Sequence, residues 1–175
     1  MLACEKMEAK NRKPNRLSGF DYSQTGAYFI TICTKDRQCI LSRVVENPPE
    51  KSVGADIIRP PKIELSKYGD IIYKAIQNIP SIYTGVLVDR FVIMPNHVHI
   101  LLRIENNSGR MISAPTVIGS MKRYASKEIG YSIWQKGFYD HIIRNEHDYT
   151  EHLQYIDTRP NGCLAKMNIT AKNKK

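Results

Sequence analysis

VLVDRFVIMPNHVHILLRI, residues 86–104, contains two apolar runs that flank a short turn around Pro95 and Asn96. Runs rich in valine, isoleucine and aromatic residues are typical of strands, and so short a connection predicts an antiparallel hairpin. Because side chains alternate along a strand, the even-numbered residues from 98 to 104 share one apolar face. His97 and His99 share the opposite face. The hairpin therefore predicts a sheet with one buried side and one side that carries two imidazoles.

The segments around the hairpin predict a mixed fold. Apolar periodicity and the positions of glycine and proline predict strands at 27–34, 38–45, 86–94 and 98–104. They also predict helices at 63–80, 114–130 and 146–157, and an extended stretch at 133–143. Pro80 and Gly130 are the expected ends of the first two helices, and a loop with four prolines fills 46–61. This order predicts an α+β, ferredoxin-like antiparallel sheet with helices packed on one face and an extra C-terminal helix.

The charge balance points to a polyanionic partner. The 175 residues include 26 Lys and Arg against 17 Asp and Glu, a formal net charge of +9. Such a balance favours nucleic acid as a partner. Basic residues gather in a flexible arm at 1–18 and in a tail at 166–175, which we expect to flank a single domain at 19–165.

Composition also bounds the setting of the protein. No run approaches the ~18 apolar residues of a membrane span, and the charged N-terminus lacks the apolar segment of a signal peptide. We therefore expect a cytoplasmic location and no membrane partner. The four cysteines form no CxxC pair and no zinc-ligand spacing, which indicates free thiols.

The spacing of His97 and His99 indicates a metal site. Residues i and i+2 of a strand lie about 7 Å apart at the backbone, near enough for two imidazoles to close on one ion. Two histidines leave the remaining positions of an octahedral ion open, which suits catalysis better than a structural zinc. A structural role for the pair is the alternative from spacing alone.

Three segments together resemble the single-tyrosine HUH transposases of insertion sequences, and within them the REP-associated tyrosine transposase branch. They are RLSGFDYSQTGAYFITICTKDRQCIL (16–41), MPNHVHIL (94–101) and IWQKGFYDHIIRNEHDYTEHLQYIDTRP (133–160). The resemblance implies a ferredoxin-like fold in which His97 and His99 hold Mg²⁺ or Mn²⁺. It also implies a nucleophilic tyrosine on the C-terminal helix, four residues before an Asn-Pro pair.

In this chain that spacing selects Tyr155, because Pro160 occupies the family's proline position; Tyr149 is the lesser candidate. Helical periodicity agrees, since Tyr155 falls on the polar face and Tyr149 on the apolar stripe expected to pack on the sheet. The implied function is a metal-dependent endonuclease and strand transferase that cleaves single-stranded or hairpin DNA through a 5′-phosphotyrosine. Relatives work as dimers or monomers, and either state is open here.

Arg159 departs from the family pattern, which has asparagine at this position. A guanidinium is all donor and cannot bind a cation, so the third metal ligand is in question. Three explanations are open for the missing ligand: His152 or Asp148 replaces it from the same helical face, a water molecule fills the position, or the site is weakened. Arg159 could instead favour the phenolate of Tyr155 and grip the phosphate.

Further DNA contacts are expected from aromatic and basic side chains. Trp134, Phe138 and Tyr139 could stack unpaired bases, and we expect one of the three to be exposed. Lys122, Arg123 and Lys127 could follow a DNA backbone or simply form a solvated helix face.

His141 and His147 lie outside the paired spacing and are interpreted as ordinary polar residues. Two other function classes remain open from the sequence. The first is a non-catalytic or degenerate nucleic-acid-binding protein that retains the fold. The second is a small metal-dependent hydrolase that uses His97 and His99 alone.

Overall fold

The computed structural model describes residues 19–45, 62–105 and 112–158. The elements in these ranges are, in chain order, β1 (Gly26–Cys33), the 3₁₀ turn η1 (Lys35–Arg37), β2 (Ser42–Val45), β3 (Lys62–Leu65), α1 (Lys67–Gln77), α2 (Ile79–Ile82), β4 (Val86–Ile93), β5 (His97–Ile104), α3 (Ala114–Ile129), β6 (Tyr139–Ile143) and α4 (Glu146–Thr158). The predicted basic arm, the proline-rich loop and the basic tail lie outside the described residues.

The main sheet has the strand order β4-β5-β1-β6, and all three pairings are antiparallel. The first strand therefore lies in the middle, between the second strand of the hairpin and the last strand of the chain. This is the ferredoxin-like arrangement that the order of the elements predicts. The hairpin turn is closed by the amide of Met94, which donates to the carbonyl of His97 at 2.8 Å.

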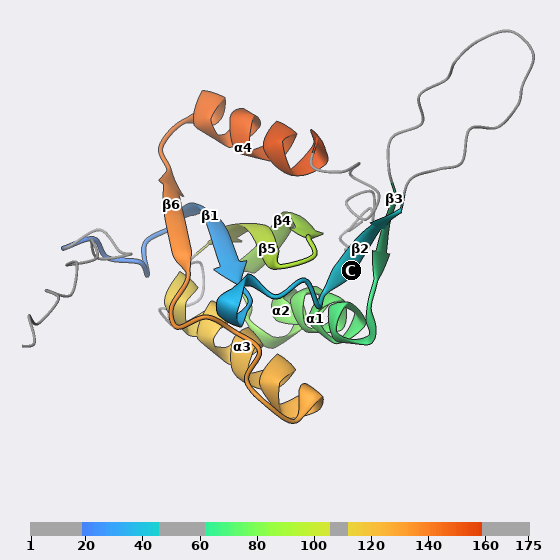
Figure 1. The fold of residues 1–175 in the computed structure, drawn as a ribbon. Coiled ribbons are helices and arrows are strands. Elements are labelled where there is room, and N and C mark those ends of the chain that lie inside the picture. Colours follow the sequence, from blue (N-terminus) through green and yellow to red (C-terminus); the bar gives the residue numbers. More distant parts are fainter. Residues whose placement is uncertain (1–18, 46–61, 106–111, 159–175) are drawn as a thin grey trace, which may run out of the picture.

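Helices α1 and α3 pack on one face of the sheet and form the main core with it (Figure 1). The even-numbered residues from 98 to 104 all point into this core and are fully buried, as alternation predicts. Ser113 caps α3 by accepting from the amide of Thr116, and Gly130 ends it with a φ of 93°, which favours glycine. The predicted helix at 114–130 is thus confirmed.

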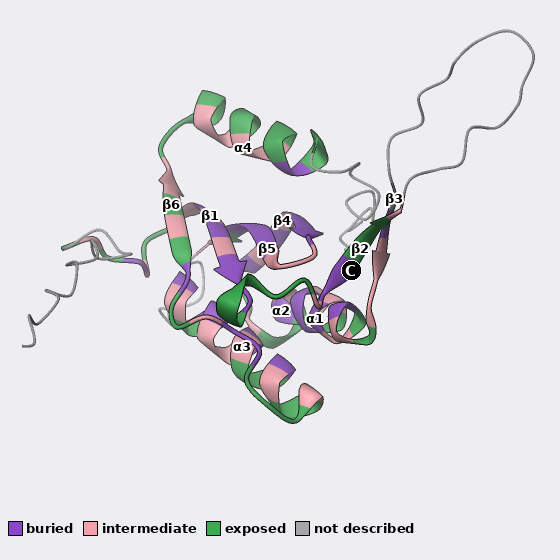
Figure 2. Cartoon of the chain, viewed as in Figure 1, coloured by how far each residue is buried: buried purple, intermediate pink, exposed green. Residues whose placement is uncertain are grey.

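Helix α4 lies on the opposite face of the sheet, so the sheet separates it from α1 and α3 (Figure 1). Ile156 is fully buried there, and Tyr149 and Leu153 pack beside it in a second, smaller cluster that includes Leu101 of β5. The apolar stripe predicted for this helix is confirmed. The rest of α4 is largely exposed (Figure 2), because its remaining side chains are polar.

The predicted helix at 63–80 is wrong at both ends. Residues 62–65 form β3, which pairs with β2 in a separate two-stranded ribbon. The helix starts only after Ser66, whose hydroxyl accepts from the amides of Tyr68 and Gly69. Pro80 does not end the helix but lies in the first turn of α2, where its missing N–H costs no hydrogen bond.

Gly69 shows how closely the chain packs at the start of α1. A Cβ atom at this position would clash with the carbonyl oxygen of Leu41, which precedes β2. That backbone oxygen also accepts from the amide of Ser66 at 2.9 Å. The ribbon is therefore attached directly to α1. Within the described residues, no helix combines the length and apolar character that crossing a bilayer requires.

Candidate functional site

The register of the sheet gathers side chains from three separate segments on the face covered by α4. His99 of β5 lies opposite Thr31 of β1, which lies opposite Tyr139 of β6. In the next row, Phe29 of β1 lies opposite His141 of β6. Opposed residues of an antiparallel pair hold their Cβ atoms about 4.5–5.5 Å apart. The sheet alone therefore brings residues distant in sequence into one patch.

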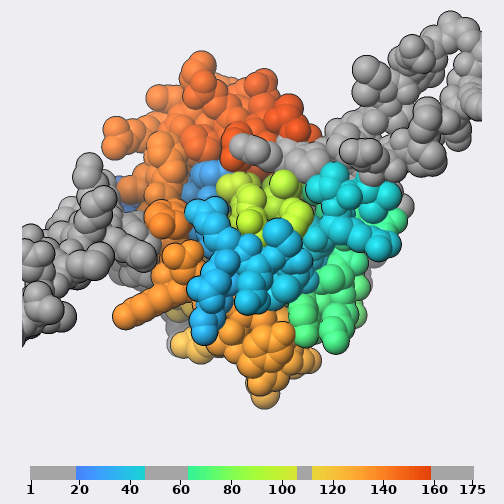
Figure 3. Space-filling model, viewed as in Figure 1, coloured from blue at the N-terminus to red at the C-terminus, as the bar shows by residue number. Residues whose placement is uncertain are grey.

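His97 and His99 lie side by side, with ring centroids 4.6 Å apart. Each ring is held at Nδ1: His97 lies 2.6 Å from Oδ1 of Asn96, and His99 lies 2.9 Å from Oγ1 of Thr31. His99 is buried, and His97 is half-buried at the end of the strand. In Figure 3 the yellow-green atoms of this hairpin reach the surface between α4 and the segment after β1.

The donor set of this pair fits a divalent ion. A bond at Nδ1 fixes the orientation of an imidazole and selects Nε2 as the metal-binding nitrogen, as is usual for histidine ligands. Two imidazole nitrogens with further positions for water or phosphate suit Mn²⁺ well, whereas Mg²⁺ prefers a larger share of oxygen ligands. The chemistry of His97 and His99 thus agrees with the predicted pair of ligands.

Helix α4 brings Tyr155 to this pair. The ring of Tyr155 lies 5.3 Å from that of His99 and 5.7 Å from that of Phe29, both edge to face. The residue is 37% exposed, so it remains accessible from solvent. The structure therefore brings together the tyrosine and the histidines that the sequence singled out.

Tyr149 has a different environment, which identifies it as a packing residue. Its hydroxyl donates to Oδ2 of Asp89 at 2.9 Å. Asp89 lies at a β-bulge in β4, between Val88 and Arg90, and such a bulge redirects side chains from the regular alternation. Burial, followed by the nearby carboxylate, raises the pKa of Tyr149. The phenolate that a nucleophile requires is thus disfavoured at this position.

Phe29 is a central part of the site that the sequence analysis missed. Its ring stacks on His99 at 5.1 Å and also contacts His152 of α4 at 4.5 Å. Together with Glu151, His152 and Tyr155 it lines an open hollow beside the tyrosine. Alternation along the opening strand already places Phe29 on the face opposite the core, and this was the available signal.

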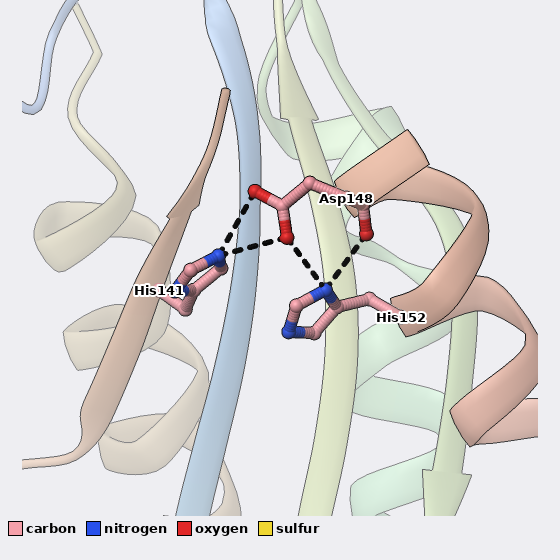
Figure 4. A group of neighbouring side chains, drawn as sticks. All are labelled: His141, Asp148 and His152. Atoms are coloured by element: carbon pink, nitrogen blue, oxygen red, sulfur yellow. Dashed lines mark hydrogen bonds and ion pairs between the residues drawn. The ribbon is translucent and has the colours of Figure 1, made fainter. Parts of the chain in front are cut away.

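A second polar cluster joins β6 to α4 (Figure 4). Nε2 of His141 lies 2.9 Å from Oδ1 of Asp148, and Nδ1 of His152 lies 3.1 Å from the same oxygen. The two imidazoles are nearly parallel, with centroids 4.7 Å apart. Burial acts to raise the pKa of Asp148, but hydrogen bonds from the Arg144 amide and from His141, with both imidazoles nearby, hold it below its ordinary value.

This cluster bears on two expectations from the sequence. Asp148 and His152 are the predicted candidates for the third ligand beside His97 and His99; in the structure the carboxylate of Asp148 lies between His141 and Nδ1 of His152. In the part of the chain that the structure describes, His141, Asp148 and His152 are the group of three metal-ligating side chains whose atoms lie within 4.8 Å of one another. His141 is therefore part of a network rather than an ordinary surface residue. Arg159 lies outside the described residues.

Two of the aromatic residues expected to stack on bases are core residues. Trp134 and Phe138 are only 6% and 7% exposed and belong to the main core. The indole Nε1 of Trp134 donates to the carbonyl of Lys122 at 3.2 Å. Because both rings are covered by protein, neither has a face available for a base. Tyr139 is the exposed member of the three, at 49%, as expected for one of them.

Lys122 is also not available for DNA. Its ammonium group donates to the carbonyls of Gln135 at 2.9 Å and Gly137 at 2.6 Å, and so holds the segment before β6 against α3. Burial lowers the pKa of Lys122. Arg123 and Lys127 are exposed on α3, as a DNA contact requires, but the sheet separates them from Tyr155.

The chain resembles known proteins in sequence and in fold, although no family model matches it. It is 29% identical over 174 residues to an uncharacterized protein of Haemophilus influenzae. The match covers 86% of this chain and 88% of the relative. A second H. influenzae protein, named "Putative REP-associated tyrosine transposase", is 24% identical over 152 residues, or 80% of this chain and 73% of the relative.

A solved structure shares the fold. It is titled "Structure of the REP associates tyrosine transposase bound to a REP hairpin", and it matches with a TM-score of 0.54 at 18% identity, over 81% of this chain and 70% of that chain. The resemblance inferred from the three sequence segments is therefore confirmed by a relative in sequence and by a neighbour in fold.

Proposed function

Because the chain resembles the REP-associated tyrosine transposases in sequence and in fold, we propose that it is a transposase that cleaves and rejoins single-stranded DNA at hairpin-bearing ends. Tyr155 is the nucleophile, and His97 and His99 hold a divalent ion, Mg²⁺ or Mn²⁺. The observation that supports this proposal most is the contact between the rings of Tyr155 and His99, which lie on different elements.

The reaction is a transfer of a phosphodiester to the phenol. The Tyr155 oxygen forms a bond to phosphorus, and the bond from phosphorus to the 3′ oxygen of the preceding nucleotide breaks. The phenolic proton is released to solvent, and the departing 3′ oxygen takes up a proton as a free hydroxyl. The downstream strand stays attached to the tyrosine through its 5′ phosphate. Because the phosphotyrosine keeps the energy of the broken bond, a 3′ hydroxyl can later reverse the step without ATP.

Tyr155 needs help from its surroundings. A phenol with a pKa of about 10 is only about a thousandth ionised at neutral pH. A divalent ion bound at Nε2 of His97 and His99 would polarise the scissile phosphate. Thr31 and Asn96 orient the two imidazoles that would hold the ion. The edge-to-face contact with Phe29 orients the ring of Tyr155.

The DNA contacts of this proposal follow from exposed groups on the same face. Tyr139 lies in the same cross-strand row as Thr31 and His99, so its exposed ring can stack on an unpaired base next to the scissile phosphate. The solved neighbour is bound to a REP hairpin according to its title, which supports a hairpin as substrate. The net charge of +9 favours such a polyanion.

The test is a search for the covalent intermediate. The full chain is incubated with labelled hairpin-bearing single-stranded DNA and Mn²⁺, and a DNA–protein adduct is sought on a denaturing gel. We expect an adduct with the wild-type chain and none with Tyr155→Phe. Tyr124→Phe is the matched control, because Tyr124 is an exposed tyrosine of α3 on the other side of the sheet.

Other outcomes identify the other function classes. Binding of the hairpin without any adduct would support a non-catalytic nucleic-acid-binding protein that retains the fold. Strand hydrolysis that survives Tyr155→Phe would support a hydrolase that depends on His97 and His99 alone. An adduct that forms equally with Tyr155→Phe would exclude Tyr155 as the nucleophile.

A further inference from the structure

The cluster of His141, Asp148 and His152 carries an inference of its own. We propose that these three side chains bind a divalent transition-metal ion of the Zn²⁺ type, at a site separate from His97 and His99. The ion would tie α4 to β6 (Figure 4). This proposal goes beyond the proposed function and does not depend on it.

The geometry already brings the three ligands toward one point. Both imidazole nitrogens lie close to Oδ1 of Asp148, at 2.9 Å for His141 and 3.1 Å for His152. Two ligands about 2.0–2.2 Å from a tetrahedral ion lie roughly 3.4 Å apart from each other. Opening the cluster by a few tenths of an ångström would therefore make room for the ion. The ion would replace the hydrogen bond between His141 and Oδ1 of Asp148, and it would also replace the one between Nδ1 of His152 and the backbone carbonyl of Asp148, now 2.8 Å long.

The elements that carry the ligands suit a metal site. Asp148 and His152 are four residues apart on α4, so they share one helix face, as pairs of metal ligands on helices commonly do. His141 reaches them from β6, the neighbouring edge strand. Two imidazoles and one carboxylate are a ligand set typical of Zn²⁺ and other divalent ions of the first transition row, and one or more positions stay open for water.

Each ligand on α4 is held in place by a further contact. Oδ2 of Asp148 accepts from the amide of Arg144 at 3.0 Å, so the carboxylate cannot rotate away freely. The ring of His152 packs on Phe29. Such outer contacts orient the ligands before the ion arrives and are a regular feature of metal sites.

The site is also accessible. The side chain of His141 is 49% exposed, while those of Asp148 and His152 are 18% and 23% exposed. A hydrated ion can thus enter from the solvent side of β6 without any opening of the core. A bound ion would fix the angle between β6 and α4. His152 lies one turn before Tyr155 on α4. The angle between β6 and α4 therefore also determines the position of the Tyr155 ring relative to His99.

The test separates this site from the His97 and His99 pair. The chain has five histidines, so His97→Ala/His99→Ala leaves His141, His147 and His152. Zn²⁺ is added to this full-length variant, and the Cε1–H signals of the three imidazoles are followed by NMR. We expect two signals to shift at about one equivalent, while the signal of His147 stays, because its side chain is 83% exposed and outside the cluster.

Calorimetry with Zn²⁺ in the same His97→Ala/His99→Ala background gives the affinity. His141→Ala and Asp148→Asn should each weaken binding at least tenfold, and the matched His147→Ala should leave it unchanged. Zn²⁺ should raise the Tm of the chain with His141 and should not raise it in His141→Ala. The proposal is overturned if no histidine signal shifts, if His147 shifts as much as the others, or if His141→Ala binds Zn²⁺ as before.

Discussion

The two faces of the four-stranded sheet are built from the same strands but differ in what they contain. Toward α1 and α3 the strands present apolar side chains, such as Ile30 and Ile100, which are fully buried. Toward α4 the same strands present Phe29, Thr31 and His99. The helix contributes one fully buried residue, Ile156, to the smaller cluster on this face. One face is a complete core, and the other is only partly closed.

Because of this difference, neighbouring residues of one strand can serve different purposes, one in the core and one in the candidate site. His99 and Ile100 are neighbours in sequence, yet alternation sends one to the site and the other to the core. A face that leaves Tyr155 accessible to solvent is packed less completely than a core. We therefore expect substitutions on the core face to lower mainly the free energy of unfolding, and substitutions on the α4 face to change mainly the formation of the DNA–protein adduct.

The largest effect on stability is expected in the core. Ile100→Ala should lower the free energy of unfolding by about 2–5 kcal/mol, because it removes buried methyl groups and leaves a cavity. Urea denaturation followed by circular dichroism measures the change. His97→Ala is the control on the opposite face and should be much less destabilising. A loss below about 1 kcal/mol for Ile100→Ala would show that this face is not the main core.

The next effect concerns activity. His97→Ala should slow formation of the DNA–protein adduct on the order of a hundredfold, about 2.7 kcal/mol in barrier, because it removes one of the two imidazoles proposed to bind the metal ion. Single-turnover assays with hairpin DNA at saturating Mn²⁺ measure it, with urea denaturation as a check on folding. An unchanged rate would mean that His97 takes no part in the reaction.

A smaller effect is expected where α4 contacts the sheet. Tyr149→Phe removes one hydrogen bond to Asp89, while Arg103 remains 3.0 Å from the same carboxylate. The free energy of unfolding should fall by about 1 kcal/mol, the usual net value of such a bond. Adduct formation should persist, since Tyr149 is a packing residue. Complete loss of the adduct in this variant, with folding intact, would contradict the assignment of Tyr155.

The smallest effect is a pH dependence of stability on the α4 face. The pKa of Asp148 is lower in the folded chain than the value of about 3.8 in the unfolded chain. Ionised Asp148 therefore stabilises the fold above pH 3.8, and this stabilisation is lost as the pH falls through the lower pKa of the folded chain. The difference in stability between wild type and Asp148→Asn should therefore be larger at pH 5 than at pH 2. Urea denaturation at both pH values measures it; a difference that grows toward pH 2 would contradict the sign.

Much of the fold could be predicted because its signals are local. The hairpin, α3 and α4 follow from alternation, from three- and four-residue periodicity and from an end signal such as Gly130. The start of α1 could not be predicted, because the sequence of residues 62–65 is compatible with a helix. These residues form a strand only because they pair with β2, which is distant along the chain. The burial of Trp134 and the contacts of Lys122 could not be predicted for a similar reason. The indole of Trp134 donates to the carbonyl of Lys122, 12 residues away, and Lys122 donates to the carbonyls of Gln135 and Gly137.

The sequence by itself determined which side chains leave the core, since alternation and helical periodicity depend only on neighbours along the chain. It thereby placed His97, His99 and Tyr155 outside the core, while the resemblance to the transposase family singled out Tyr155 among the ten tyrosines. Only the tertiary structure decided how the remaining polar groups combine. The pairing of β1 with β6 sets His141 opposite Phe29, and α4 then meets His141 with Asp148 and His152. Contacts of this kind depend on strand order and helix placement, which no local pattern in the chain encodes.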